Sequence, residues 1–245
     1  MSLIEHRKGF TLIEMVLVMV ILGILATVAM KSLKSFTDQS RFDITTEEME
    51  RLARAIIGDE RLVSAGVRTD FGYVGDVGAL PSNLDALVTN PGGYSTWNGP
   101  YIRSDFSENT EDYKRDAWNE PYTYNGGVII TSNGGGNTIT KQFASSVNDL
   151  TSNTIKGIVR DSDLSPPGDS ASSITVTVQY PNGTGSLTIS STSPSASGEF
   201  SFSNSIPIGL HRLQAIIDAD TISKYVAVYP GKTIYTELRF AGDLW

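Results

Sequence analysis

The chain opens with a long apolar stretch, which then gives way to amphipathic and alternating patterns. Residues 10–30 carry a single acidic side chain and no basic one. As a helix rising 1.5 Å per residue, these 21 residues span about 31 Å, enough to cross the hydrocarbon core of a bilayer. No proline occurs between residues 11 and 57. The pattern therefore predicts one helix of nearly fifty residues whose first half is apolar all round.

The second half of this helix carries a stripe on one face. Its members recur at steps of three and four, which places them on the same side of a helix. They are Phe42, Thr45, Met49, Leu52 and Ile56. We expect this stripe to pack under the chain's own sheet, and Gly58 to end the helix.

One acidic residue, Glu14, lies inside the membrane-length stretch. A carboxylate there costs roughly 2.5–3.5 kcal/mol on insertion scales, so it requires a partner. His6, Arg7 and Lys8 precede the stretch and favour a cytoplasmic N-terminus, with the rest of the chain exported. The alternatives are a secretory signal cleaved near 27–29 and a plain signal anchor. Neither of them explains Glu14.

The sequence Gly9-Phe10-Thr11-Leu12-Ile13-Glu14 resembles the N-terminal motif of type IV pilins and pseudopilins. The resemblance implies cleavage after Gly9 by a membrane prepilin peptidase and N-methylation of the new N-terminal Phe10. It also implies that Glu14 pairs with the amine of Phe10 on a neighbouring subunit, which would supply the missing partner. Many members of the family carry a proline where this chain has Lys31. The resemblance therefore does not extend to the local helix melting that such a proline permits.

The middle of the chain, residues 61–143, is rich in glycine, proline, asparagine and aromatic residues. It predicts a short capped helix within 80–88 and short strands at 122–124 and 128–132. The block resembles the head of the major pseudopilin of type II secretion. The matching positions are Leu84, Ala86, Leu87, Val88, Trp97, Gly99, Pro100, Tyr101, Asp116, Trp118, Pro121 and Tyr122. We expect these aromatic residues to pack in a core, and the segments 72–78 and 104–114 to be loops.

Members of that family commonly bind calcium in a loop that follows this block. The corresponding segment here, residues 132–137, contains serine, asparagine and glycine but no carboxylate. Calcium prefers hard, anionic oxygen ligands. We therefore expect no tight calcium site and no other cofactor.

The last ninety residues follow a Ser- and Asn-rich segment, 145–153, that is typical of a linker. Beyond it, short alternating segments separated by turn signals predict about seven strands and hence an Ig-like β-sandwich. They are 154–160, 174–180, 185–189, 198–202, 210–217, 225–229 and 233–240. The set resembles the carboxypeptidase regulatory-like (transthyretin-like) domain, which implies a binding or spacer module. Asp161, Asp163 and Asp169 are candidate cation ligands, but turn formation is the interpretation we favour for them, and we expect no metal.

Composition excludes several classes of function. The net charge of −8 disfavours nucleic acid as a partner, and the absence of cysteine rules out disulfides and thiolate sites. Once the leader is removed, His211 is the only histidine, and it lies in an expected strand. The carboxylate pair of Asp218 and Asp220 belongs to no recognisable hydrolase motif. We therefore predict that the chain is not an enzyme.

These observations predict an α+β protein with a long hydrophobic N-terminal helix, a pilin-like α+β head and an all-β sandwich. The expected parts are a leader (1–9), a stalk helix (10–58, with 10–30 transmembrane), a head (59–144) and a sandwich (154–245). We expect a subunit of a type II secretion pseudopilus, or alternatively a type IV pilus subunit that displays its sandwich for adhesion. A membrane-anchored binding protein that never polymerises comes third.

The expected partners are copies of this chain, other pilin-like subunits, prepilin peptidase and the assembly platform of the inner membrane. The expected location is the bacterial inner membrane, crossed once with the C-terminus outside the cytoplasm. A periplasmic or cell-surface filament would follow.

Overall fold

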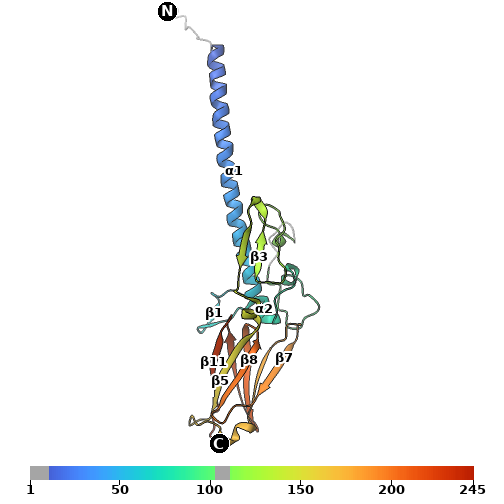
Figure 1. Cartoon of the computed structure of the whole chain (residues 1–245), viewed down its shortest axis with the longest axis vertical. Coiled ribbons are helices and arrows are strands. Elements are labelled where there is room, and N and C mark those ends of the chain that lie inside the picture. Colours follow the sequence, from blue (N-terminus) through green and yellow to red (C-terminus); the bar gives the residue numbers. More distant parts are fainter. Residues whose placement is uncertain (1–10, 103–110) are drawn as a thin grey trace, which may run out of the picture. The chain divides into compact units, whose positions relative to one another are not determined.

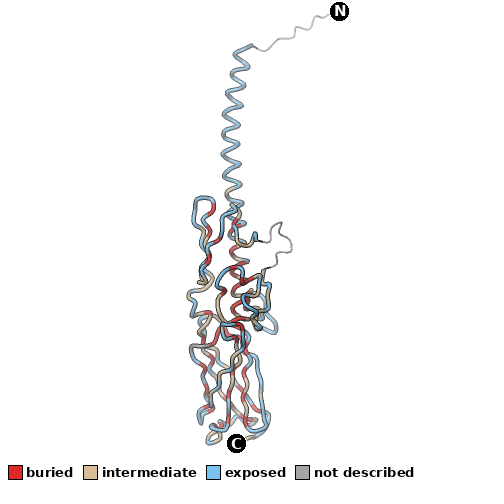
Figure 2. The backbone as a smooth tube through the Cα atoms, turned by 90° about the vertical axis from the view of Figure 1, so that its right-hand side faces the viewer, coloured by how far each residue is buried: buried red, intermediate tan, exposed pale blue. Residues whose placement is uncertain are grey.

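In a computed structural model, the chain is described over residues 11–102 and 111–245. The described chain divides into two compact units, residues 1–44 and 45–245. Helix α1 (Leu12–Ile57) is 46 residues long and contributes to both of them. In the first unit it is exposed on all sides, and none of its apolar side chains is buried by the described residues (Figure 2).

The second unit contains the head and the sandwich, and it begins on the last turns of α1. The predicted stripe is confirmed for Thr45, Met49, Leu52 and Ile56, which are all almost fully buried, whereas its first member, Phe42, is 43% exposed. The helix ends where the sequence predicted, since Gly58 adopts φ +84° and its N–H donates to the Arg54 carbonyl oxygen. This left-handed conformation suits a residue without a side chain.

The head is made of short elements around this helical face. They are β1 (Val63–Ser64), β2 (Val67–Arg68), α2 (Gly72–Val77), η1 (Leu84–Leu87), η2 (Asp112–Lys114), β3 (Ile129–Ser132), η3 (Gly134–Gly136), β4 (Ile139–Gln142) and α3 (Val147–Thr151). Strands β1 and β2 form one hairpin, and β3 and β4 form another (Figure 1). The expected short helix is η1, capped by Asn83, whose side chain accepts a hydrogen bond from the Ala86 N–H.

Two expectations about irregular segments were wrong. The expected loop 72–78 is helix α2 (Gly72–Val77) followed by its cap Gly78. Tyr73, Val74 and Val77 are buried in the head core, and this packing outweighs the poor helix propensity of glycine. The expected linker contains helix α3, capped by the Ser146 side chain. Part of the expected loop 104–114 lies outside the described residues, and 112–114 form the 3-10 helix η2.

The predicted sandwich is confirmed. Its seven strands are β5 (Asn153–Arg160), β6 (Thr175–Pro181), β7 (Leu187–Thr192), β8 (Glu199–Ile206), β9 (Gly209–Ile217), β10 (Asp220–Val228) and β11 (Thr233–Arg239), with η4 (Gly168–Ser173) between β5 and β6. One sheet has the order β10-β9-β6-β7 and the other β11-β5-β8, in which β11 runs parallel to β5 (Figure 1). Alternate residues of both sheets fill the core between them, among them Ile155, Val176, Leu213 and Leu238.

Head and sandwich share buried contacts within the second unit. Leu150 of α3 is fully buried in the head core, and so is Ile208 from the segment that precedes β9. The Ile208 N–H donates to the Leu150 carbonyl oxygen at 2.9 Å. The rings of Phe71 and Tyr229 also meet, with centroids 6.2 Å apart. Packing of this kind predicts that the two parts stabilise each other.

Candidate assembly helix and its capped ends

The first candidate site is the start of helix α1. Gly9 and Phe10, the expected processing residues, lie outside the described residues. Glu14 is described and forms a reciprocal pair with Thr11, the residue before the helix. Its Oε2 accepts hydrogen bonds of 2.9 Å from the Thr11 N–H and from the Thr11 hydroxyl. In return, the Glu14 N–H donates to Thr11 Oγ1 at 3.3 Å. This geometry is a capping box.

The capping box gives Glu14 a role that the sequence reasoning missed. The signal was present, because a threonine followed three residues later by glutamate, just before an apolar run, is typical of a helix start. Within a single chain the carboxylate is therefore engaged by neutral hydrogen-bond donors of Thr11. Among the described residues Glu14 has no charged partner, so a cation from another molecule can pair with it.

The apolar part of α1 meets the requirements of a membrane span. Among the described residues it is the one helix long and apolar enough to cross a bilayer, with a mean hydropathy of 2.7 over its most apolar window. No residue in that window is buried by the rest of the chain. The helix continues through Gly23 and Lys31 without interruption. A Cβ atom added at Gly23 would meet nothing within 4 Å, so the single chain supplies no packing reason for this glycine.

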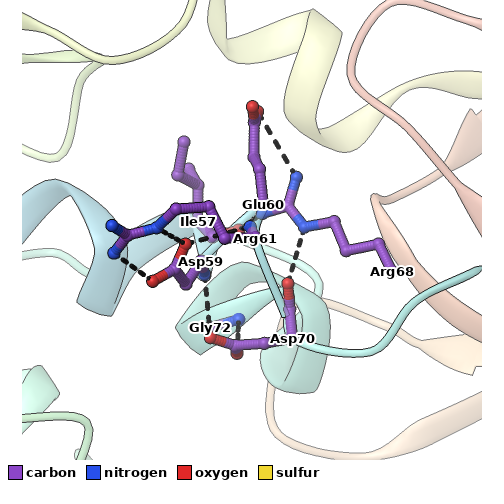
Figure 3. A network of polar contacts seen from close by, with 7 residues as sticks. All are labelled: Ile57, Asp59, Glu60, Arg61, Arg68, Asp70 and Gly72. Atoms are coloured by element: carbon purple, nitrogen blue, oxygen red, sulfur yellow. Dashed lines mark hydrogen bonds and ion pairs between the residues drawn. The ribbon is translucent and has the colours of Figure 1, made fainter. Parts of the chain in front are cut away.

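The other end of α1 is closed by Arg68, which comes from the β1–β2 hairpin (Figure 3). Its side chain is only 4% exposed. One guanidinium N–H donates to the Ile57 carbonyl oxygen at 2.5 Å, and Nε donates to the Asp70 carbonyl oxygen at 2.7 Å. The cation also lies 4.7 Å from the centroid of the Phe71 ring. A positive charge against the last carbonyl of a helix satisfies an orphan acceptor and complements the helix dipole.

Asp70 completes this cap from the other side (Figure 3). Its Oδ2 accepts a hydrogen bond from the Asp59 N–H at 2.8 Å, and its Oδ1 accepts one from the Gly72 N–H at 3.0 Å. The segment after α1 is thereby tied to the start of α2. Gly72 must be glycine here, since a Cβ atom would lie 2.5 Å from the backbone nitrogen of Gly58. The network fixes the end of the stalk helix to the head.

Three tyrosine hydroxyls of the head donate hydrogen bonds of 2.8 Å to carboxylates. The pairs are Tyr101 with Asp76, Tyr113 with Asp85 and Tyr122 with Glu48. Burial raises the pKa values of Asp76 and Glu48, although the tyrosine hydrogen bonds act in the opposite direction. The expectation that the head's aromatic residues pack in a core is confirmed for Tyr122 and Tyr124, which are both buried.

The segment expected to replace the family's calcium loop, 132–137, includes η3 and packs against Asp116. The Ser132 hydroxyl donates to Asp116 Oδ2 at 2.5 Å. The backbone N–H groups of Trp118 and Glu120 donate to Asp116 Oδ1, each at 2.9 Å. The nearby carboxylate is thus already occupied by protein donors. The absence of a tight calcium site remains a prediction.

The candidate cation ligands are only partly brought together. Asp161 and Asp163 lie with Asp243, all three offering carboxylate oxygens within 4.8 Å of one another, whereas Asp169 lies apart from them in η4. Asp243 comes from the other end of the sandwich sequence, and no local pattern could have identified it. Asp161 is fully buried, and its two oxygens each accept a hydrogen bond of 3.0 Å from Ser165. This arrangement organises a turn.

His211 is buried in the sandwich at 2% exposure. Its Nε2 lies 2.7 Å from the Pro207 carbonyl oxygen, which makes this nitrogen the donor. Burial lowers the pKa of His211 to about 4, so the ring is neutral at physiological pH. The histidine thus has a structural role in the turn before β9.

Comparisons with known proteins agree with the motif at the N-terminus. Residues 6–30 match the family model described as the prokaryotic N-terminal methylation motif. The type II secretion system core protein G of Pseudomonas aeruginosa is 31% identical over 127 residues, which is 49% of this chain and 74% of that protein. The protein of the same name from Xanthomonas campestris is 30% identical over 97 residues, 40% of this chain and 58% of its own length. A fimbrial protein of Pseudomonas aeruginosa is 33% identical over 84 residues, 33% of this chain and 53% of that protein. About half of this chain thus lies outside even the longest of these matches.

Proposed function

We propose, from the premise that this chain belongs to the type IV pilin and pseudopilin family, that it is a structural filament subunit and not an enzyme. The observation that carries the proposal is the first half of α1. None of its apolar side chains is buried by the described residues, and its first turn carries the acidic residue Glu14. Such a helix is stable in a bilayer or in a bundle of identical helices, and the family supplies both environments in turn.

The N-terminal residues have defined roles in this proposal. Prepilin peptidase cleaves after Gly9, and Phe10 becomes the methylated N-terminus. The carboxylate of Glu14 then pairs with the Phe10 amine of a neighbouring subunit. Removing either member would leave the other charge unpaired in an apolar environment.

The type II secretion pseudopilus is the filament we favour. The similarity to core protein G covers up to 49% of this chain, whereas the fimbrial protein matches 33% of it. A type IV pilus subunit that displays its sandwich for surface contact is the second candidate. The fimbrial similarity and the presence of a seven-stranded sandwich after the head favour it. A non-polymerising membrane anchor comes third.

In the proposed pathway the chain first crosses the bacterial inner membrane once, with its C-terminus outside the cytoplasm. The basic residues before the apolar stretch favour this orientation. An assembly platform in the inner membrane then extracts the subunit into a periplasmic or cell-surface filament, together with copies of itself and other pilin-like subunits.

Processing and location test the proposal. Mass spectrometry should show a mature chain that begins at Phe10 and carries one added methyl group. The Gly9→Ala variant should retain the nine-residue leader. Immunogold electron microscopy should locate the filaments in the periplasm when the gene is expressed in its natural host. Filaments extending from the cell surface would favour the pilus. A processed chain that forms no filament at all would favour the anchor.

A further inference from the structure

The outer face of the three-stranded sheet of the sandwich carries a groove of about 990 Å³. This volume is at the upper end of the range of about 300–1,000 Å³ that is typical of ligand sites. The strands β11, β5 and β8 form its floor (Figure 1). The segment 192–195, which leads from β7 towards β8, also lines it. The side chains on the floor are Lys156, Ile158, Glu199, Ser201, Tyr235 and Glu237.

The register of the sheet arranges these six side chains in two rows. Lys156 of β5 pairs with Tyr235 on one side and with Ser201 on the other. Ile158 pairs in the same way with Glu237 and Glu199. Neighbouring strands lie about 4.8 Å apart, so each row extends about 10 Å across the sheet. The floor thus combines an aromatic ring, an aliphatic side chain, a hydroxyl, one ammonium and two carboxylates on one face of the sheet.

The polar groups of this floor have unused hydrogen-bonding capacity. In the part of the chain that the structure describes, Lys156 and Glu237 form no ion pair and no side-chain hydrogen bond, and Glu199 accepts one from the Ser197 hydroxyl at 3.3 Å. Tyr235 is 75% exposed. A large exposed aromatic ring beside donors and acceptors with spare capacity can stack on a ligand that offers both an apolar face and polar groups.

We propose that this groove binds a neutral oligosaccharide. Each sugar hydroxyl both donates and accepts hydrogen bonds, which matches an ammonium and carboxylates placed side by side. The C–H face of a pyranose ring matches the Tyr235 ring and the Ile158 side chain. Two carboxylates against one ammonium disfavour an anionic polymer, since the whole chain is also acidic. The central position of Lys156 disfavours a basic peptide.

The chain offers a matched control on its other sheet. Tyr225 of β10 is 65% exposed and pairs with Arg212 of β9. It is an aromatic residue beside a cation on the outer face of a sheet, as Tyr235 is, but it does not line the groove. Because both tyrosines are exposed, replacing either one should leave the fold intact.

Isothermal titration calorimetry tests the proposal on the full-length chain in a detergent without a sugar headgroup. The probes are maltohexaose, cellohexaose and chitohexaose, with hexalysine and a trimer of galacturonic acid as charged comparisons. At least one neutral probe should bind saturably. Tyr235→Ala should weaken that binding about tenfold or more. Glu237→Gln should weaken it as well, and Tyr225→Ala should leave it unchanged. The proposal fails if no neutral probe binds, if only a charged probe binds, or if the two tyrosine variants behave alike.

Discussion

The guanidinium of Arg68 donates a hydrogen bond to the carbonyl oxygen of Ile57, the last residue of the 46-residue helix α1. A side chain from a two-stranded hairpin therefore closes the helix that the family uses for assembly. The same guanidinium holds the Asp70 carbonyl oxygen, so one residue fixes both the end of the stalk and the start of α2.

Replacing Arg68 should destabilise the second unit. Arg68→Ala leaves two carbonyl oxygens without their buried donor, and we expect a loss of roughly 2–3 kcal/mol in the free energy of unfolding. Arg68→Lys should recover part of it, because lysine keeps the charge at the helix end but not the two-sided geometry. Chemical denaturation followed by circular dichroism measures both variants. Arg61→Ala is the control, since the Arg61 side chain is 77% exposed and contacts Asp59 rather than the end of the helix. Equal effects at the two positions would contradict the capping role.

Leu150 tests whether head and sandwich unfold together. It is fully buried in the head core although it comes from the segment directly before β5. We expect Leu150→Ala to cost about 2–5 kcal/mol through the cavity that it leaves. Val147→Ala, on an exposed position of the same helix, should have little effect.

Hydrogen exchange shows which parts of the protein lose stability in Leu150→Ala. Amides of η1 in the head and of β9 in the sandwich should lose protection in parallel, because both parts share this buried contact. If only the head amides lost protection, the sandwich would be an independently stable domain.

The buried His211 predicts a loss of stability in mild acid. Its pKa is lowered to about 4 in the folded protein from about 6.5 in the unfolded chain. As the pH falls below about 6.5, the unfolded chain therefore binds a proton before the folded protein does. The stabilisation is complete above pH 6.5 and is lost progressively towards pH 4.

Thermal melts between pH 7 and pH 4.5 measure this loss. The melting temperature of the wild type should fall with acidification, and that of His211→Gln should fall less. Subtracting one curve from the other removes the contribution of carboxylates that titrate in the same range. Glu48 is one of them, and its raised pKa makes the folded protein more stable as the pH falls, opposite to the effect of His211. Parallel curves would show that His211 does not contribute.

Local patterns predicted the elements whose side chains follow a simple period. The stripe from Thr45 to Ile56 and the alternation in the seven strands are each visible in a short window, because one face of the element meets one core. The sequence did not indicate α2, since its glycines disfavour a helix and only burial of Val74 and Val77 against distant residues stabilises it. Helix α3 was missed because its segment is rich in serine and asparagine, and it is stabilised by the burial of Leu150 in the head core.

Some residues of the candidate site could be predicted from the sequence, and others could not. Glu14 stood out as a lone acid in an apolar run, and its capping partner was within reach of a motif search. Arg68 had no such signal, because its partner Ile57 is eleven residues away and is contacted through its backbone. The meeting of Asp243 with Asp161 and the rows of the groove depend on strand order and register. No local window contains that information.

We propose that the charge of Glu14 drives assembly, and two variants separate this role from its capping role. Glu14→Gln removes the charge but keeps an oxygen that can accept from Thr11, whereas Thr11→Ala breaks the capping box and keeps the charge. The direct measurement is filament counting by electron microscopy, with membrane fractionation as the check that both variants still insert. We expect Glu14→Gln to abolish filaments and Thr11→Ala largely to preserve them. Normal filaments in Glu14→Gln, or their loss in Thr11→Ala alone, would contradict this proposal.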